Sequence, residues 1–238
     1  MRPIQKLRPG SVITLEDGSR RIVNKKYSPY RDALEPLTAN IGPYCSYCEH
    51  PIKQNSDREI EHIKLKSKYP NLKTYWGNFL LSCGTCNTKK ATAVVKLYNT
   101  HLPHRNNTFL SFEYTGGVVR VNPQLTGLSK THAENLIKLV RLDEPPSCTD
   151  NRFFLRLEQW NIATRYLQDY KNNKKNVETI IDYVKVAGYW SIWFTVFKDY
   201  DIIRARLISD FNGTDAACFD KNNHYNPISR NPTKSDPI

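Results

Sequence analysis

Two pairs of cysteines have the spacing of metal-binding knuckles. Cys45 and Cys48 form the first C-x-x-C pair, and Cys83 and Cys86 form the second. Four thiolates paired in this way match the tetrahedral coordination of structural zinc, and a site closed by four cysteines has no open position for a catalytic water. We therefore expect a structural Zn²⁺ ion. Buried free cysteines or reactive dithiols are the alternatives, but neither of them requires the second knuckle.

The segment between the knuckles carries residues suited to phosphodiester chemistry. It contains the acidic-histidine pair Glu61-His62, then Asn78 in the run WGNFLL, and Asn87 directly follows Cys86. In order and context these residues resemble the HNH endonuclease family in its cysteine-containing form. The resemblance implies a ββα-metal fold, in which a strand and loop present the acid and the histidine and a second strand leads to a helix beginning near Cys86.

The resemblance also implies a role for each residue. Cleavage of a phosphodiester needs a deprotonated water and a cation that neutralises charge in the transition state. By resemblance His62 deprotonates the water, and Glu61 and Asn87 supply oxygen ligands to Mg²⁺ or Mn²⁺, which prefer such ligands. Asn78 would hold the loop that aims the imidazole. Asn87 could instead cap the helix, and Asn78 could be an ordinary turn residue.

Two features depart from a simple ββα-metal pattern. Neighbours on a regular strand point to opposite faces, so Glu61 and His62 share a site only if the backbone is irregular there. The family also has Asp more often than Glu before its histidine. Since Glu is one methylene longer, the position of the metal can shift, and Glu59 is a possible substitute or additional ligand.

Other potential ligands are isolated in the sequence. His101 and His104, in THLPH, have the spacing of a metal-binding pair, but no third ligand follows nearby, so we do not expect them to bind a metal. Cys148 and Cys218 stand alone and are expected to be small core residues.

Positive charge is concentrated around the proposed site. The chain has a formal net charge of +12, and it has no Asp or Glu from His62 through Phe112. This surplus favours contact with nucleic acid, although a solvated basic face is the alternative. If the chain stays extended after His62, three lysines lie on its side as a track for phosphates, and two more begin the following helix. The expected nucleic-acid-binding residues are Lys64, Lys66, Lys68, Lys89 and Lys90. The pattern does not distinguish DNA from RNA.

The flanking sequence predicts an α+β protein with two parts. Residues 11–24 and 109–121 have the pattern of hairpins around Asp-Gly and Gly-Gly turns, and residues 30–37 and 131–142 have helical patterns. Pro145-Pro146 ends the second helix, and the chain beyond is mainly helical through about residue 209, followed by a polar stretch that we expect to be a loose tail or an extended arm. We therefore predict a nuclease region at 1–147 and a helical assembly or partner-binding region at 148–238.

The run GYWSIWFTVFKD is apolar over most of a helix surface, so it packs in a core or binds a partner. With the opening MRPIQK and the later ACFD, it resembles the HNH nuclease subunits of Septu and retron-linked antiphage defence systems. That resemblance implies a separate ATPase subunit and, in some systems, a retron reverse transcriptase with its RNA and DNA. No G-x-x-x-x-G-K-[ST] loop occurs in this chain, which is consistent with ATP binding elsewhere.

No stretch has the roughly 20 apolar residues that span a bilayer, and the first residues lack a signal-peptide core, so we expect a cytoplasmic protein without membrane contact.

Two alternative functions are consistent with part of the features described above. One is a non-catalytic zinc module that binds nucleic acid or scaffolds a complex. The other is a restriction or homing type of HNH nuclease that acts without a partner.

Overall fold

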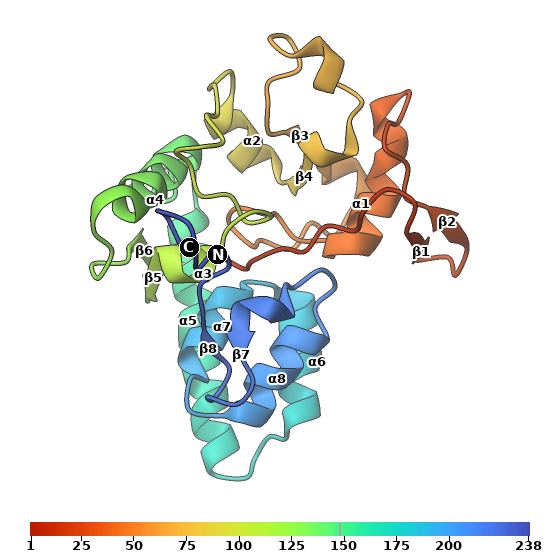
Figure 1. Cartoon of the computed structure of the whole chain (residues 1–238). Helices are drawn as coiled ribbons and strands as arrows, with labels where there is room; N and C mark the ends of the chain where they lie inside the picture. The colour runs from red at the N-terminus through yellow and green to blue at the C-terminus, as the bar shows by residue number, and fades with distance from the viewer. Residues whose placement is uncertain (148) are drawn as a thin grey trace.

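The computed structural model of the chain describes residues 1–147 and 149–238, so the predicted core residue Cys148 lies outside the described residues. It is a mixed α/β structure, and its described strands form four two-stranded antiparallel sheets. In Figure 1 the amino-terminal half, coloured red to green, occupies the upper part, and the later helices and the last small hairpin, coloured cyan to blue, occupy the lower part. The predicted α+β class is confirmed.

The segment between the cysteine knuckles forms two strands, and the second knuckle begins a helix, as the resemblance predicts. Strand β3 (Glu59–His62) pairs with β4 (Phe79–Ser82), and His62 lies opposite Phe79. Strand β4 is buried along its whole length. It leads directly into helix α2 (Gly84–Lys90), which packs against β3.

The flanking hairpins and helices form close to their predicted places because turn residues and hydrophobic spacing act locally. The hairpins are β1 (Val12–Thr14) with β2 (Arg20–Ile22), and β5 (Phe112–Thr115) with β6 (Val118–Val121). A 3-10 turn (Tyr30–Ala33) continues into α1 (Leu34–Ile41), and α3 (Thr108–Ser111) precedes α4 (Gly127–Val140). Gly116 adopts the left-handed φ of 57° that lets the second hairpin turn.

The second half is helical, as predicted. Its elements are α5 (Arg152–Lys171), α6 (Val177–Ala187), α7 (Trp190–Val196), α8 (Asp201–Ser209) and a small hairpin of β7 (Phe219–Asp220) with β8 (Asn226–Pro227). Cys218 is fully buried, as expected of a small core residue. None of the described helices has the length and hydropathy required to cross a bilayer.

The aromatic run around α7 forms the core of this half. Trp190 stacks on Phe194 with ring centroids 4.4 Å apart, and Trp193 stacks on Phe197 at 6.0 Å. All four side chains are 2% exposed or less. Of the two interpretations of this run, burial in the chain's own core is therefore correct, and these rings need no partner to cover them.

The polar carboxy-terminal tail, which we expected to be loose or an extended arm, is held against the rest of the chain. Arg230 forms an ion pair of 2.8 Å with Asp215 and donates to the carbonyl of Ile4. The main-chain oxygen of Ile238 accepts from the backbone N–H of Asn107. The sequence could not decide between the two, because a polar stretch does not reveal the buried groups with which it can pair. The two chain ends consequently lie near each other, beside α3 (Figure 1).

Hydrogen bonds and a close backbone approach join the two predicted parts on either side of residue 148. The buried carboxylate of Glu49, next to the first knuckle, accepts from the backbone N–H of Ser191 at 2.8 Å and from its hydroxyl at 2.7 Å. It also accepts from the backbone N–H of Arg2. Gly188 approaches so closely that a Cβ there would lie 2.6 Å from the carbonyl oxygen of Glu49. The division into two parts stays a prediction.

Candidate active site and metal centre

The four knuckle cysteines converge on one point. Their sulfur atoms all lie within 4.8 Å of one another, and Sγ of Cys48 lies 3.7 Å from Sγ of Cys83. A zinc ion with Zn–S bonds of about 2.3 Å in a tetrahedron places its sulfurs roughly 3.8 Å apart, so the residues fit this ion. The separation is too long for a disulfide, which needs about 2.05 Å. The cysteines are mostly buried, so a metal bound here would be closed off from solvent.

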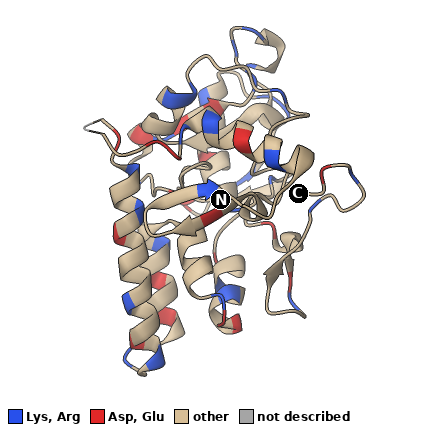
Figure 2. Ribbon diagram, turned by 90° about the vertical axis from the view of Figure 1, so that its left-hand side faces the viewer, with Lys and Arg blue, Asp and Glu red and all other residues tan. Residues whose placement is uncertain are grey.

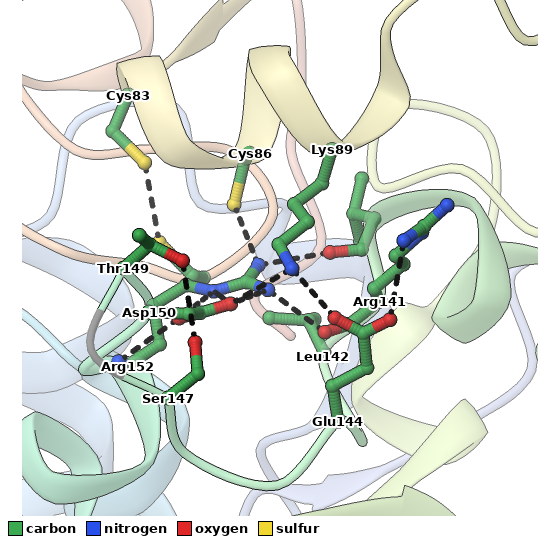
Figure 3. Close-up of polar contacts among 12 residues, drawn as sticks. Cys83, Cys86, Lys89, Arg141, Leu142, Glu144, Ser147, Thr149, Asp150 and Arg152 are labelled. Carbon is green, nitrogen blue, oxygen red and sulfur yellow. Dashed lines mark hydrogen bonds and ion pairs between the residues drawn. The ribbon is translucent and has the colours of Figure 1, made fainter.

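Arg152 connects the cysteine cluster to the helical half. Figure 3 shows its guanidinium between the sulfur of Cys86, 3.3 Å away, and the carboxylate of Asp150. The same guanidinium donates to the main-chain oxygens of Val140 and Arg141 at the end of α4. Four thiolates on one zinc leave a net negative charge, which a buried guanidinium offsets. The first turn of α5 therefore contributes to the electrostatics of the metal centre.

Lys89 is already paired in this structure. Its ammonium lies 2.6 Å from the carboxylate of Glu144 and 3.6 Å from that of Asp150, as the contacts in Figure 3 show. A phosphate would have to compete with these carboxylates for Lys89. The proposed contact between Lys89 and nucleic acid stays a prediction that this arrangement does not favour.

His62 lines a groove of about 540 Å³ to which β3 and α2 both contribute. Its Nε2–H donates to the carbonyl of Lys73 at 2.9 Å, so the neutral ring carries its lone pair on Nδ1. The rings of Tyr30 and Phe79 contact the imidazole edge to face, with centroids 4.9 and 5.2 Å away. Burial lowers the pKa of His62, and nearby lysines lower it further. An imidazole that is neutral and held in one orientation can accept a proton from water, as a general base must.

The possible metal ligands form two contacts between β3 and α2. Glu59 and Glu61 lie on the same face of the regular strand, and α2 places Asn87 and Lys90 opposite them. The side-chain amide of Asn87 donates to the carboxylate of Glu59. The ammonium of Lys90 pairs with Glu61 at 2.7 Å, and both side chains are 3% exposed or less.

The backbone irregularity that we expected at Glu61-His62 is absent, because β3 pairs with β4 in unbroken register from Glu59 to His62. All of these side chains nevertheless line the groove that His62 lines. Glu61 contacts α2 through Lys90, and His62 is the last residue of β3. Burial raises the pKa of Glu61, and the charge of Lys90 opposes that rise.

Asn78 supports the loop that follows His62. Its side-chain oxygen accepts from the backbone N–H of Lys64 at 2.7 Å, and its amide donates to the carbonyls of Lys64 and Leu72 at 2.9 and 3.2 Å. The side chain of Asn78 therefore connects the two ends of the loop between Lys64 and Leu72. Lys73, whose carbonyl holds the imidazole, follows Leu72 directly.

The lysine track does not have the predicted form. Strand β3 ends at His62, and the chain turns at Leu65, whose carbonyl accepts from the backbone N–H of Lys68. Lys66 and Lys68 are exposed, and Lys66 lies over the ring of Tyr30, 5.0 Å from its centroid. Lys64 lies over the ring of Tyr69 at the same distance. The extended geometry was wrong, and of these three lysines Lys66 lines the groove.

Comparison with known proteins agrees with this geometry. Residues 45–92 match the HNH endonuclease family. The segment from residue 45 to 92, called the HNH segment below, contains both knuckles, β3, β4 and α2. Over 49 residues the chain is 47% identical to the Septu protein PtuB of Bacillus thuringiensis, a match that covers 20% of this chain and 19% of that protein. The chain therefore matches about a fifth of the length of this relative.

Sequence reasoning missed the groups that surround the predicted residues. The carbonyl of Lys73, the ring of Tyr30 and the guanidinium of Arg152 all contact site residues, yet none belongs to a motif. A backbone carbonyl carries no sequence signal, and Arg152 lies 66 positions from the cysteine it contacts. Only the fold could identify them.

Proposed function

We propose that the chain is a metal-dependent endonuclease that hydrolyses phosphodiester bonds of nucleic acid, with His62 as its general base. The observation that supports this most directly is the hydrogen bond from Nε2 of His62 to the carbonyl of Lys73. It fixes the tautomer and leaves Nδ1 able to accept a proton at the groove.

In this mechanism Nδ1 of His62 takes a proton from a water molecule as the water oxygen bonds to phosphorus. The bond from phosphorus to the leaving oxygen breaks, and that oxygen takes a proton from solvent. The protonated imidazole then returns its proton to solvent. Asn78 acts as a positioning residue, because it braces the loop whose carbonyl holds the ring.

A Mg²⁺ or Mn²⁺ ion would supply positive charge to the scissile phosphate and the leaving oxygen. Asn87 and Glu61 are the ligands that family resemblance suggests, and the contact between Asn87 and Glu59 supports Glu59 as a further ligand. The oxygen donors of these side chains suit such an ion. Lys90 now pairs with Glu61, so metal binding would compete with its ammonium.

Nucleic acid would enter over the loop after His62. Lys66 lines the groove, Lys64 and Lys68 lie two positions from Lys66 in the sequence, and no acidic residue occurs between His62 and Phe112. Along the long helices of the other half, by contrast, basic and acidic residues are interspersed (Figure 2). We assign the first phosphate contacts to these three lysines, and Lys89 and Lys90 would join only after release from their carboxylates.

We further propose that the chain is the effector nuclease of an antiphage defence complex with an ATPase subunit. The support is the resemblance of its first and late segments to Septu and retron-linked nuclease subunits, together with the similarity of its HNH segment to a Septu protein. A retron reverse transcriptase with its nucleic acids is a possible further partner. Copurification of the tagged chain with an ATPase encoded beside it would support the assignment, and a chain that cleaves fully alone would contradict it.

The test of the catalytic proposal is cleavage of a mixed DNA and RNA panel with Mg²⁺ or Mn²⁺, with the ATPase present. His62→Ala should lower the cleavage rate by about 10²–10⁴-fold, which is the usual contribution of a general base. His224→Ala is the matched control, because His224 is exposed and pairs with a carboxylate on the helical half. Equal zinc content in all three proteins must be verified first.

Cleavage by His62→Ala at the wild-type rate would exclude this residue as the base.

A separate experiment with Glu59→Gln and Glu61→Gln distinguishes which carboxylate binds the metal. The variant that raises the Mg²⁺ concentration needed for half-maximal rate identifies the carboxylate that holds the ion. If none of the proteins cleaves, the zinc module that binds nucleic acid without catalysis becomes the better interpretation.

A further inference from the structure

A second cluster of metal-ligating side chains lies outside the HNH segment. His101 comes from the loop before α3, His132 from the first half of α4, and Asp236 from the carboxy-terminal tail. One ligand atom from each lies within 4.8 Å of the others. The end of the chain approaches α3 and α4 in Figure 1, which brings the third residue to the other two.

Ring nitrogens of both histidines converge on one carboxylate oxygen of Asp236. Nε2 of His101 lies 2.9 Å from Oδ2 of Asp236, and Nδ1 of His132 contacts the same oxygen. The two imidazole rings are perpendicular, with centroids 5.7 Å apart. Two ring nitrogens and a carboxylate therefore point to one location.

Neighbouring hydroxyl groups hydrogen-bond to the remaining polar atoms of His101 and Asp236. His101 is fully buried, and its second nitrogen, Nδ1, lies 2.8 Å from the hydroxyl of Ser111. The hydroxyl of Ser129 donates to the other carboxylate oxygen of Asp236 at 2.7 Å. Metal-binding imidazoles and carboxylates are usually oriented by such partners on the atoms that do not touch the metal.

We propose that His101, His132 and Asp236 bind a second transition-metal ion, most suitably Zn²⁺. Imidazole nitrogen with a carboxylate is a common ligand set for zinc, and three protein ligands leave a fourth position for water. Ser111 accepts from Nδ1–H of His101 in this state, which directs the lone pair of Nε2 to the ion. His104 takes no part, because it is not a member of the cluster.

The ion would fasten the tail to the rest of the chain. It joins three segments that are separated by 31 and 104 positions, as counted from 101 to 132 and from 132 to 236. Its position is independent of the cysteine cluster and of the groove that contains His62, so the inference does not rest on the nuclease proposal. The site is therefore structural in role, although its donor atoms include nitrogen and oxygen in place of four sulfurs.

The first test is the metal content of the full chain, purified without a polyhistidine tag from zinc-supplemented cells. Inductively coupled plasma mass spectrometry should give two equivalents of zinc for the wild type. His132→Ala and Asp236→Asn should each retain one, in the cysteine cluster, and the control His224→Ala should retain two. One equivalent in the wild type would overturn the proposal.

A second measurement needs no variant and so does not depend on folding of a mutant. Co²⁺ is titrated into the metal-free wild type while its absorption spectrum is recorded. Thiolate ligands give intense charge-transfer bands, whereas nitrogen and oxygen ligands give only weak visible bands. The proposal requires a second equivalent that adds weak bands after the thiolate bands saturate. Saturation of every band at one equivalent would exclude the site.

Discussion

The HNH segment and the helical half are held together by different means. The HNH segment has four-residue strands, a seven-residue helix and a cluster of four cysteines. The helical half packs stacked tryptophan and phenylalanine rings between longer helices. A short segment that buries little core would depend on a bound metal, whereas a larger one can rely on apolar burial. We therefore expect metal binding to matter for the stability of the HNH segment and aromatic burial to matter for that of the helical half.

The largest expected effect is that of zinc removal. Chelation of the metal, or Cys83→Ala, should unfold the HNH segment, because structural zinc contributes about 10–16 kcal/mol to such folds at neutral pH. Hydrogen exchange of the full chain should show loss of protection in β3, β4 and α2 while the core of α7 remains protected. Unchanged protection in the HNH segment would contradict the structural role of zinc.

The corresponding test of the helical half is Trp193→Ala, which removes a fully buried ring. It should lower the free energy of unfolding by about 3–5 kcal/mol through lost burial and the cavity that remains. Chemical denaturation measures the loss, and the zinc content of the folded protein should not change. Phe154→Ala is the control, because Phe154 is 56% exposed and its removal should cost less than about 0.5 kcal/mol.

Arg152→Met tests the connection between the two regions. It leaves the carboxylate of Asp150 buried without its guanidinium and removes a positive charge from the cysteine cluster. The free energy of unfolding should fall by about 3 kcal/mol, as expected when one partner of a buried ion pair is lost. A chelator should also extract zinc faster than from the control Arg165→Met, which changes an exposed residue of the same helix. Equal extraction rates would show that Arg152 does not stabilise metal binding at the cysteine cluster.

The smallest effect concerns Asp210 at the end of α8. Its hydrogen bond from Arg206 is the main reason that its pKa falls to about 2. Because the folded-state pKa lies below the ordinary value of 3.8, the pair stabilises the fold above that pH, and the contribution is lost as pH falls towards 2. Arg206 is more than a third exposed, so the contribution should stay below about 1 kcal/mol. The difference in melting temperature between the wild type and Asp210→Asn should be present at pH 6 and shrink below pH 4, whereas a constant difference would argue against this pair.

Sequence alone was sufficient for features that depend on near neighbours. The convergence of the two knuckles and the two hairpins follow from spacing and turn chemistry, and these predictions of fold were confirmed. Hydrophobic periodicity likewise predicted the helices of the second half. These signals are local because helix and turn geometry bring together only residues a few positions apart.

Tertiary structure decided the contacts between distant segments. It placed Asn87 beside Glu59, paired Lys90 with Glu61, buried the aromatic run inside the chain, and brought Asp236 to two histidines. A polar tail or an isolated histidine has no partner that sequence can name, since its hydrogen bonds are satisfied only after the backbone has brought remote groups within about 3 Å. The residue types of the active site were therefore readable from the sequence, whereas their pairing was set by how α2, β3 and the tail pack together.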